Sequence, residues 1–248
     1  MKECAFCSHQ GKLSNEHIVS QWLKGLFPGR ITSIIGDGRG LKKPFTSESI
    51  DWKAKVVCEA CNNNWMSDIE SHHAKPILTP LVTGKMDIPI DQAAAHSLAL
   101  FVFKTAVILD HSNRSREPFF SRRIRHAFRI HRLIPSDVNM WMCGYAGHRA
   151  GVHAITLYPQ AESTTGYRFD MYACTCAFGN FVFQMLAVKQ LRALQLRTLS
   201  SAPKNVSIPF WPKIRDGFVW PPRLALMNRS DFNAFAARWG QDIELIGE

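Results

Sequence analysis

Two pairs of cysteines with C-x-x-C spacing constrain this chain more than any other feature. The first pair is Cys4 and Cys7, and the second pair, much further along the chain, is Cys58 and Cys61. In each pair the two thiolates can face the same ion from a tight turn, and two such turns complete a tetrahedral Cys4 zinc site. Such a site is closed to other ligands. The sequence therefore predicts an N-terminal domain that is held together by structural zinc.

The remaining cysteines do not suggest a disulfide framework. The chain has seven cysteines, which is an odd number, and the two C-x-x-C pairs favour metal binding in a reducing compartment. Cys143, Cys174 and Cys176 lie in apolar stretches and are expected to be buried, reduced thiols. The sequence opens MKECAFC without an apolar segment behind a basic start, so we expect no secretory signal and a cytoplasmic location.

The charge of the chain indicates a polyanionic partner. Its formal net charge is +10 and its pI is about 9.5, and Lys and Arg side chains that neutralise phosphates release condensed counterions. DNA is therefore the leading partner and RNA is a second candidate, while a basic enzyme that does not act on nucleic acid is the alternative. No run approaches the roughly 18 consecutive apolar residues that span a bilayer, so we expect no membrane partner.

The residue composition and the apolar periodicity of the sequence change near residue 85, and an α+β protein of two domains is expected. Residues 1–85 hold both cysteine pairs and little apolar periodicity, whereas residues 86–248 look able to form their own core. An apolar helix is expected over 91–110, with Lys104 extending its ammonium to an edge. An amphipathic helix is expected over 117–133, and a capped C-terminal helix starts at Ser230 or Asp231.

Beyond Pro135 the apolar residues alternate with a period of two. Strands are expected over 138–146 and 152–159, which flank the sequence GHRAG, and over 167–178 and 181–188, which flank Gly179-Asn180. Two hairpins of this kind predict a four-stranded antiparallel sheet in the C-terminal domain.

The segment after the first cysteine pair contains a Glu-His pair. The combination of C-x-x-C, EHIVSQWL and CEACN resembles the HNH endonuclease family in its zinc-stabilised form, over residues 1–75. That family places a ββα-metal active site beside a Cys4 knuckle. Glu16 and His17 match its first motif, with Ser20 where proline is usual. Asn62 matches its last motif, and Asp51 is the candidate to substitute for the middle asparagine, which this chain lacks.

The residue types themselves suit phosphodiester hydrolysis, which needs a deprotonated water and stabilisation of the charge that develops on the phosphate. His17, with an ordinary pKa near 6.5, is the expected general base. The resemblance implies that Glu16 and Asn62 hold a catalytic Mg²⁺ or Mn²⁺, distinct from zinc. Glu70, two turns along the same helix, is a further candidate for this catalytic site, and for His72 and His73 a surface position is favoured over metal ligation.

Arginines recur at helical spacing in the second predicted helix, opposite its apolar side. They could contact phosphates along a groove edge, or they could form a solvated basic face that acidic residues from elsewhere neutralise. The predicted nucleic-acid contacts are Arg122, Arg125, Arg129 and Arg132.

The sequence thus predicts a metal-dependent HNH endonuclease, a hydrolase acting on DNA. The C-terminal domain is expected to contact DNA, to self-associate as a homodimer or to recognise a partner. Two alternatives stay open. One is a non-catalytic zinc module that binds DNA, in which Glu16 and His17 merely shape the fold, and the other is an HNH-type nuclease that acts on RNA.

Overall fold

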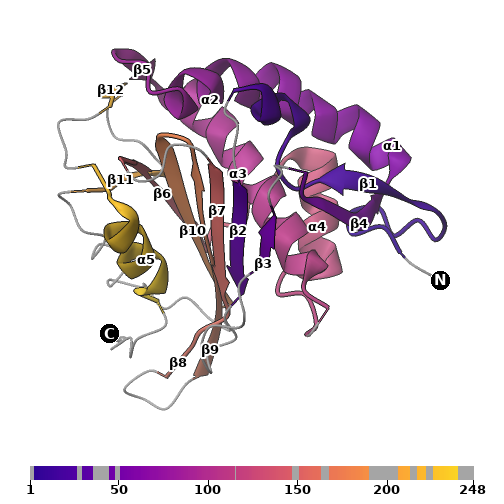
Figure 1. The fold of residues 1–248 in the computed structure, drawn as a ribbon. Coiled ribbons are helices and arrows are strands. Elements are labelled where there is room, and N and C mark those ends of the chain that lie inside the picture. The colour runs from indigo at the N-terminus through magenta and orange to yellow at the C-terminus, as the bar shows by residue number, and fades with distance from the viewer. Residues whose placement is uncertain are drawn as a thin grey trace.

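The protein has a mixed α+β fold in which helices cover both faces of a large sheet (Figure 1). This arrangement confirms the α+β class that the sequence predicts. The computed structural model describes residues 3–26, 30–35, 45–47, 51–114, 116–146, 151–162, 168–189, 206–212, 217–221 and 226–239.

In the described residues the large sheet has eight strands in the order β11-β6-β10-β9-β7-β2-β3, with β8 beside β9. Neighbouring strands run antiparallel except for β2 and β7, which are parallel. The strands are β2 (Arg30–Ile35), β3 (Phe45–Ser47), β6 (Val138–Gly144), β7 (Gly151–Leu157), β8 (Gln160–Glu162), β9 (Arg168–Phe178), β10 (Phe181–Lys189) and β11 (Ile208–Trp211).

One of the two predicted hairpins is present. Strands β9 and β10 pair from Phe178 opposite Phe181 outward, and Gly179 takes a φ of 54° in the turn between them, a conformation that glycine adopts without strain. The other predicted hairpin is wrong, because β6 pairs with β10 and β11 while β7 pairs with β9 and β2. Alternation identifies these strands correctly, but it carries no information on which strands become neighbours.

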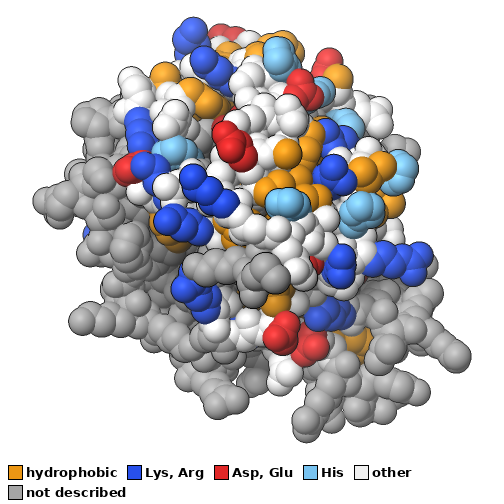
Figure 2. Space-filling model, turned by 90° about the vertical axis from the view of Figure 1, so that its right-hand side faces the viewer, with side chains coloured by type: hydrophobic (Ala, Val, Ile, Leu, Met, Phe, Trp, Pro, Cys, Tyr) orange, Lys and Arg blue, Asp and Glu red, His pale blue; other side chains and the backbone are white. Residues whose placement is uncertain are grey.

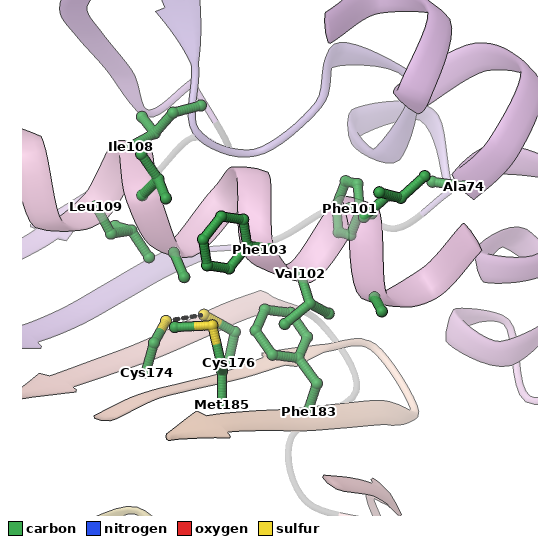
Figure 3. Packing of buried hydrophobic residues seen from close by; sticks show 14 of the residues in the cluster. Ala74, Phe101, Val102, Phe103, Ile108, Leu109, Cys174, Cys176, Phe183 and Met185 are labelled. Carbon is green, nitrogen blue, oxygen red and sulfur yellow. Dashed lines mark hydrogen bonds between the residues drawn. The ribbon is translucent and has the colours of Figure 1, made fainter. Parts of the chain in front are cut away.

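Helix α3 (Gln92–Ser112) lies along one face of this sheet and forms the centre of the core. Asp91 caps its start by accepting a hydrogen bond from the Ala94 amide at 2.8 Å. Figure 3 shows Val102 and Phe103 of α3 directed toward Phe183 and Met185 of the sheet. By length and composition α3 could cross a membrane, but 72% of its apolar window is buried inside the protein, as expected of a core helix.

Two further helices complete the layers. Helix α4 (Arg122–His131) begins at Ser121 and packs Phe128 against Phe103 of α3, with ring centroids 4.8 Å apart. Helix α5 (Arg229–Ala237) covers the opposite face of the sheet, as Figure 1 shows. The N-cap of α5 is Asn228, with Asp231 completing a capping box, so the predicted start at Ser230 or Asp231 is slightly too late.

The N-terminal part forms a second, smaller layer. Strand β1 (Leu13–His17) pairs antiparallel with β4 (Lys53–Cys58), and a continuous helical stretch follows β4 directly. One core cluster joins this part to α3 and the sheet, and the division at residue 85 stays a prediction. The remaining elements are η1 (Gln21–Gly25), α1 (Glu59–Cys61), η2 (Asn62–Met66), η3 (Ile69–Ala74), α2 (Lys75–Val82), and the paired strands β5 (Ile88–Ile90) and β12 (Phe218–Trp220).

Candidate functional site

The four cysteines of the two C-x-x-C pairs converge, as the sequence predicts. The sulfur atoms of Cys4, Cys7, Cys58 and Cys61 all lie within 4.8 Å of one another, and those of Cys7 and Cys58 are 3.5 Å apart. In a tetrahedral site with Zn–S bonds of about 2.3 Å, neighbouring sulfurs are about 3.8 Å apart. The cluster could therefore hold a metal such as zinc.

Local backbone structure explains why the two pairs meet. Cys4 and Cys7 lie in a tight turn that the Ser8 amide closes by donating to the Cys4 carbonyl at 3.1 Å. The Ala5 amide donates to the Val56 carbonyl at 2.8 Å, which fastens the turn to β4. Since Cys58 ends β4 and Cys61 lies in the first turn of the following helix, both face this turn.

His17 lies at the end of β1 beside the carboxylate of Asp51. The Nε2 atom of His17 is 3.3 Å from Asp51 Oδ1 and 3.3 Å from the Gln21 Nε2 atom. The ammonium of Lys53 is 2.8 Å from Asp51 Oδ2, and that of Lys24 contacts Oδ1. Two lysines and one carboxylate give this group, which we call the His17 site, a net charge of +1 while His17 is neutral.

The surroundings set the protonation states in the His17 site. Burial and the nearby Lys24 and Lys53 lower the pKa of His17 below its ordinary value, against the opposite influence of Asp51. Hydrogen bonds from the two lysines hold the pKa of Asp51 far below its usual range. At neutral pH the imidazole is thus neutral beside an ionised carboxylate. A charge-assisted bond from Nε2–H to Asp51 is stronger than a bond from the Gln21 amide, which leaves Nδ1 as the basic nitrogen.

Glu16 points away from the His17 site, because successive side chains of a strand face opposite sides. It is 3% exposed, and its Oε1 atom lies 3.4 Å from the ammonium of Lys104. The same ammonium contacts Glu70, so the structure does bring the two predicted acidic residues together. The prediction that Lys104 reaches an edge of the core is wrong, since its side chain is 0% exposed.

Asn62 lies in the first turns of the helical stretch and donates to the Ser14 hydroxyl at 3.3 Å. The pairing of β1 with β4 shifts between Ser14 and Glu16, so strand alternation does not place Asn62 beside Glu16. In the described part of the chain, the Asn62 side chain contacts Ser14 and the His17 side chain contacts Asp51. No side-chain contact there connects the first pair of residues with the second. His72 and His73 are exposed and lie 2.9 and 3.7 Å from Asp68.

The predicted arginine stripe is divided between surface and interior. Arg125 is 8% exposed and donates to the carbonyls of Ala5, at 2.6 Å, and Phe120, so it fastens the first cysteine turn to α4. Arg132 ends α4 with its guanidinium 4.7 Å from the Trp65 ring, and Arg129 is half-buried. Arg122 is exposed, 3.8 Å from Glu3. A phosphate contact on the surface therefore fits Arg122 best and does not fit Arg125.

Sequence reasoning missed Lys24, Lys53 and Gln21 as members of the His17 site, because single polar residues on exposed segments form no pattern. Lys104 did carry a signal, because a charge in the middle of an apolar helix needs a buried partner of opposite charge.

Comparisons of the chain with family models, with curated proteins and with solved structures find no match.

Proposed function

We propose that this protein is an HNH-type endonuclease that hydrolyses phosphodiester bonds in DNA, with His17 as general base. The observation that carries the proposal is an imidazole at a strand end, 3.3 Å from the Asp51 carboxylate and flanked by two lysines that contact the same carboxylate. The antiparallel pair of strands β1 and β4, followed by a helix and next to four convergent cysteines, is consistent with a zinc-stabilised ββα unit. In this proposal the zinc is structural.

Each group of the His17 site has a task in hydrolysis. His17 Nδ1 removes a proton from water as the water oxygen attacks phosphorus, the bond to the leaving oxygen breaks, and that oxygen takes a proton from solvent. Asp51 fixes the imidazole through Nε2 and stabilises its protonated form. Lys24 and Lys53, which are partly exposed, can neutralise the oxygens of the phosphate in the transition state.

The predicted Mg²⁺ or Mn²⁺ does not fit its predicted ligands as they stand. Glu16 is buried and already neutralised by Lys104, and a second cation at this carboxylate would be repelled by the ammonium. We therefore assign no step to a divalent ion, and the metal dependence of cleavage stays a prediction that metal titration tests.

The molecular surface offers candidate contacts for a long polyanion. Figure 2 shows Lys and Arg side chains spread over one face of the molecule, among histidines and small hydrophobic areas. Arg122 and Arg123 at the start of α4 are exposed, as is Lys53 in the His17 site. These positions are consistent with backbone contacts, which give affinity without sequence readout.

Plasmid digestion tests the proposal. We expect the wild type to nick or linearise supercoiled DNA and the His17→Ala variant to lose about 10²- to 10⁴-fold in rate, as for removal of a general base. His126→Ala, which removes an exposed histidine from α4, is the matched control and should cleave normally. Parallel digests of RNA, and reactions without added divalent ion or with Mg²⁺ or Mn²⁺, define the polymer and any metal requirement of the zinc-loaded protein. Equal cleavage by wild type and His17→Ala would overturn the assignment.

The pairing of Glu16 and Glu70 with Lys104 favours one second candidate, a non-catalytic zinc module that binds DNA, because these carboxylates are then part of the fold. It predicts that wild type and His17→Ala bind DNA equally well and that neither cleaves it under any metal condition.

A further inference from the structure

Two carboxylates from distant parts of the chain converge on one ammonium in the core. Lys104 projects from the middle of α3 and contacts Glu16 of β1 and Glu70 of η3. Its Nζ atom also lies 5.7 Å from the centre of the Phe101 ring. The Lys104 side chain is 0% exposed and that of Glu16 is 4% exposed, whereas Glu70 is 18% exposed and lies nearest to solvent.

Carboxylates in such an environment require a positive charge, because an ionised group without a partner is very unfavourable in a medium of low dielectric constant. Burial raises the pKa of Glu16, and Lys104 opposes this effect. The pKa of Lys104 is itself raised, because Glu70 and Glu16 together outweigh its burial. The three groups thus stabilise one another's charges.

A divalent cation bound by Glu16 and Glu70 would need the oxygens that now face the ammonium. Carboxylate oxygens are the ligands that Mg²⁺ and Mn²⁺ prefer, so the chemistry of the pair suits a metal ion. Lys104 prevents its binding, because its charge is fixed in the same place by a helix that is buried on nearly every side.

We propose that Lys104 is the built-in cation of the Glu16–Glu70 pair, and that this pair is a latent divalent-metal site that opens only when the ammonium is removed. This inference does not depend on nuclease activity, because it concerns binding and stability alone.

The experiment measures Mn²⁺ binding to the full-length, zinc-loaded protein by electron paramagnetic resonance of the free ion. In the wild-type background, Glu16→Gln and Glu70→Gln should leave Mn²⁺ binding unchanged. Lys104→Ala, which removes the ammonium and leaves space for an ion, should gain a Mn²⁺ site and rise in melting temperature when Mn²⁺ is added. Adding Glu70→Gln to Lys104→Ala should weaken that site about tenfold or more. Lys55→Ala, which removes an exposed lysine from β4, controls for net charge and should gain nothing.

Each other result contradicts the proposal. A wild-type Mn²⁺ affinity that falls about tenfold on Glu16→Gln or Glu70→Gln would show that metal already binds there beside Lys104. A folded Lys104→Ala protein without a new Mn²⁺ site would show that the pair is no latent site. If Lys104→Ala is unfolded in the absence of metal, refolding in Mn²⁺ supports the proposal and failure to refold overturns it.

Discussion

The Nε2 atom of His17 lies 3.3 Å from Oδ1 of Asp51, and both oxygens of that carboxylate also face lysines. The Asp51 carboxylate thus orients the imidazole and also holds the ammonium groups of Lys24 and Lys53 close to it. Both ammonium groups therefore act on the imidazole itself, and a phosphate that approached the imidazole would meet them too.

The activity of the wild type should persist at mildly acidic pH. In the proposed reaction His17 can act as a base only when it is unprotonated, and its pKa lies below the ordinary value of 6.5. The acid limb of the kcat/KM profile should therefore have its midpoint below 6.5. Lys24→Gln removes a charge that lowers this pKa and should move the midpoint to higher pH. Lys12→Gln, at an exposed position outside the site, should not, and a shared midpoint for the two variants would contradict this account.

Removal of zinc should unfold the N-terminal part of the protein. The first cysteine turn carries Phe6, which packs on Trp65 with ring centroids 4.9 Å apart, so loss of the metal should also loosen this aromatic contact. We expect a strong chelator to lower the melting temperature of the wild type, as followed by circular dichroism. Cys7→Ser should start at the lower value and respond little to the chelator. Metal analysis that finds no zinc in the purified wild type would refute the prediction.

Substitution of Lys104 by methionine should destabilise the fold strongly. The change leaves Glu16 and Glu70 without their cation, and breaking a buried charge network in this way typically costs about 3 to 5 kcal/mol. Urea unfolding should show this loss, and adding Glu16→Gln and Glu70→Gln should restore a large part of it, because the unpaired charges are then gone. No recovery in the triple variant would mean that the lysine stabilises through packing and not through charge.

Two arginines of α4 should behave in opposite ways. Arg125→Ala removes donors from the Ala5 and Phe120 carbonyls, and hydrogen bonds from a charged donor contribute about 1.5 to 3 kcal/mol each, so the free energy of unfolding should fall by about that amount or more. Arg122→Ala should change stability by less than about 0.5 kcal/mol. It should instead weaken DNA binding and reduce the salt dependence of log K by about one contact. Binding titrations at several salt concentrations separate the two effects.

Features with a local cause could be predicted from the sequence. The cysteine spacing requires tight turns, the apolar run after Asp91 requires burial, and Gly179-Asn180 suits a hairpin turn, and each of these appears in the structure. The helical spacing of Glu70 relative to Asn62 made Glu70 a candidate for the catalytic site, but the ammonium that joins Glu70 to Glu16 in the structure was not expected there.

Features that depend on distant neighbours could not be predicted. Strand β7 pairs with β2, which lies far earlier in the chain, and nothing in either segment indicates this pairing. Lys104 was expected to extend its ammonium to an edge, as long charged side chains in apolar helices do. Its counterions, Glu16 and Glu70, lie far away in the sequence. Asp51 was expected only as a substitute for a missing asparagine. Its contacts with Lys24 and Lys53 depend on the path of the backbone just before β4, which the sequence does not indicate.

The path of the chain between β1 and β4 has a practical consequence for fragment studies. Strand β2 lies between β1 and β4 in the sequence, but it belongs to the large sheet. There it pairs with β7 from Arg30 opposite Gly151 to Ile35 opposite Thr156. A polypeptide consisting only of residues 86–248 would present β7 as a bare sheet edge with unsatisfied backbone amides and carbonyls, which invites intermolecular pairing. Such a truncated product should aggregate unless residues 30–47 are supplied with it.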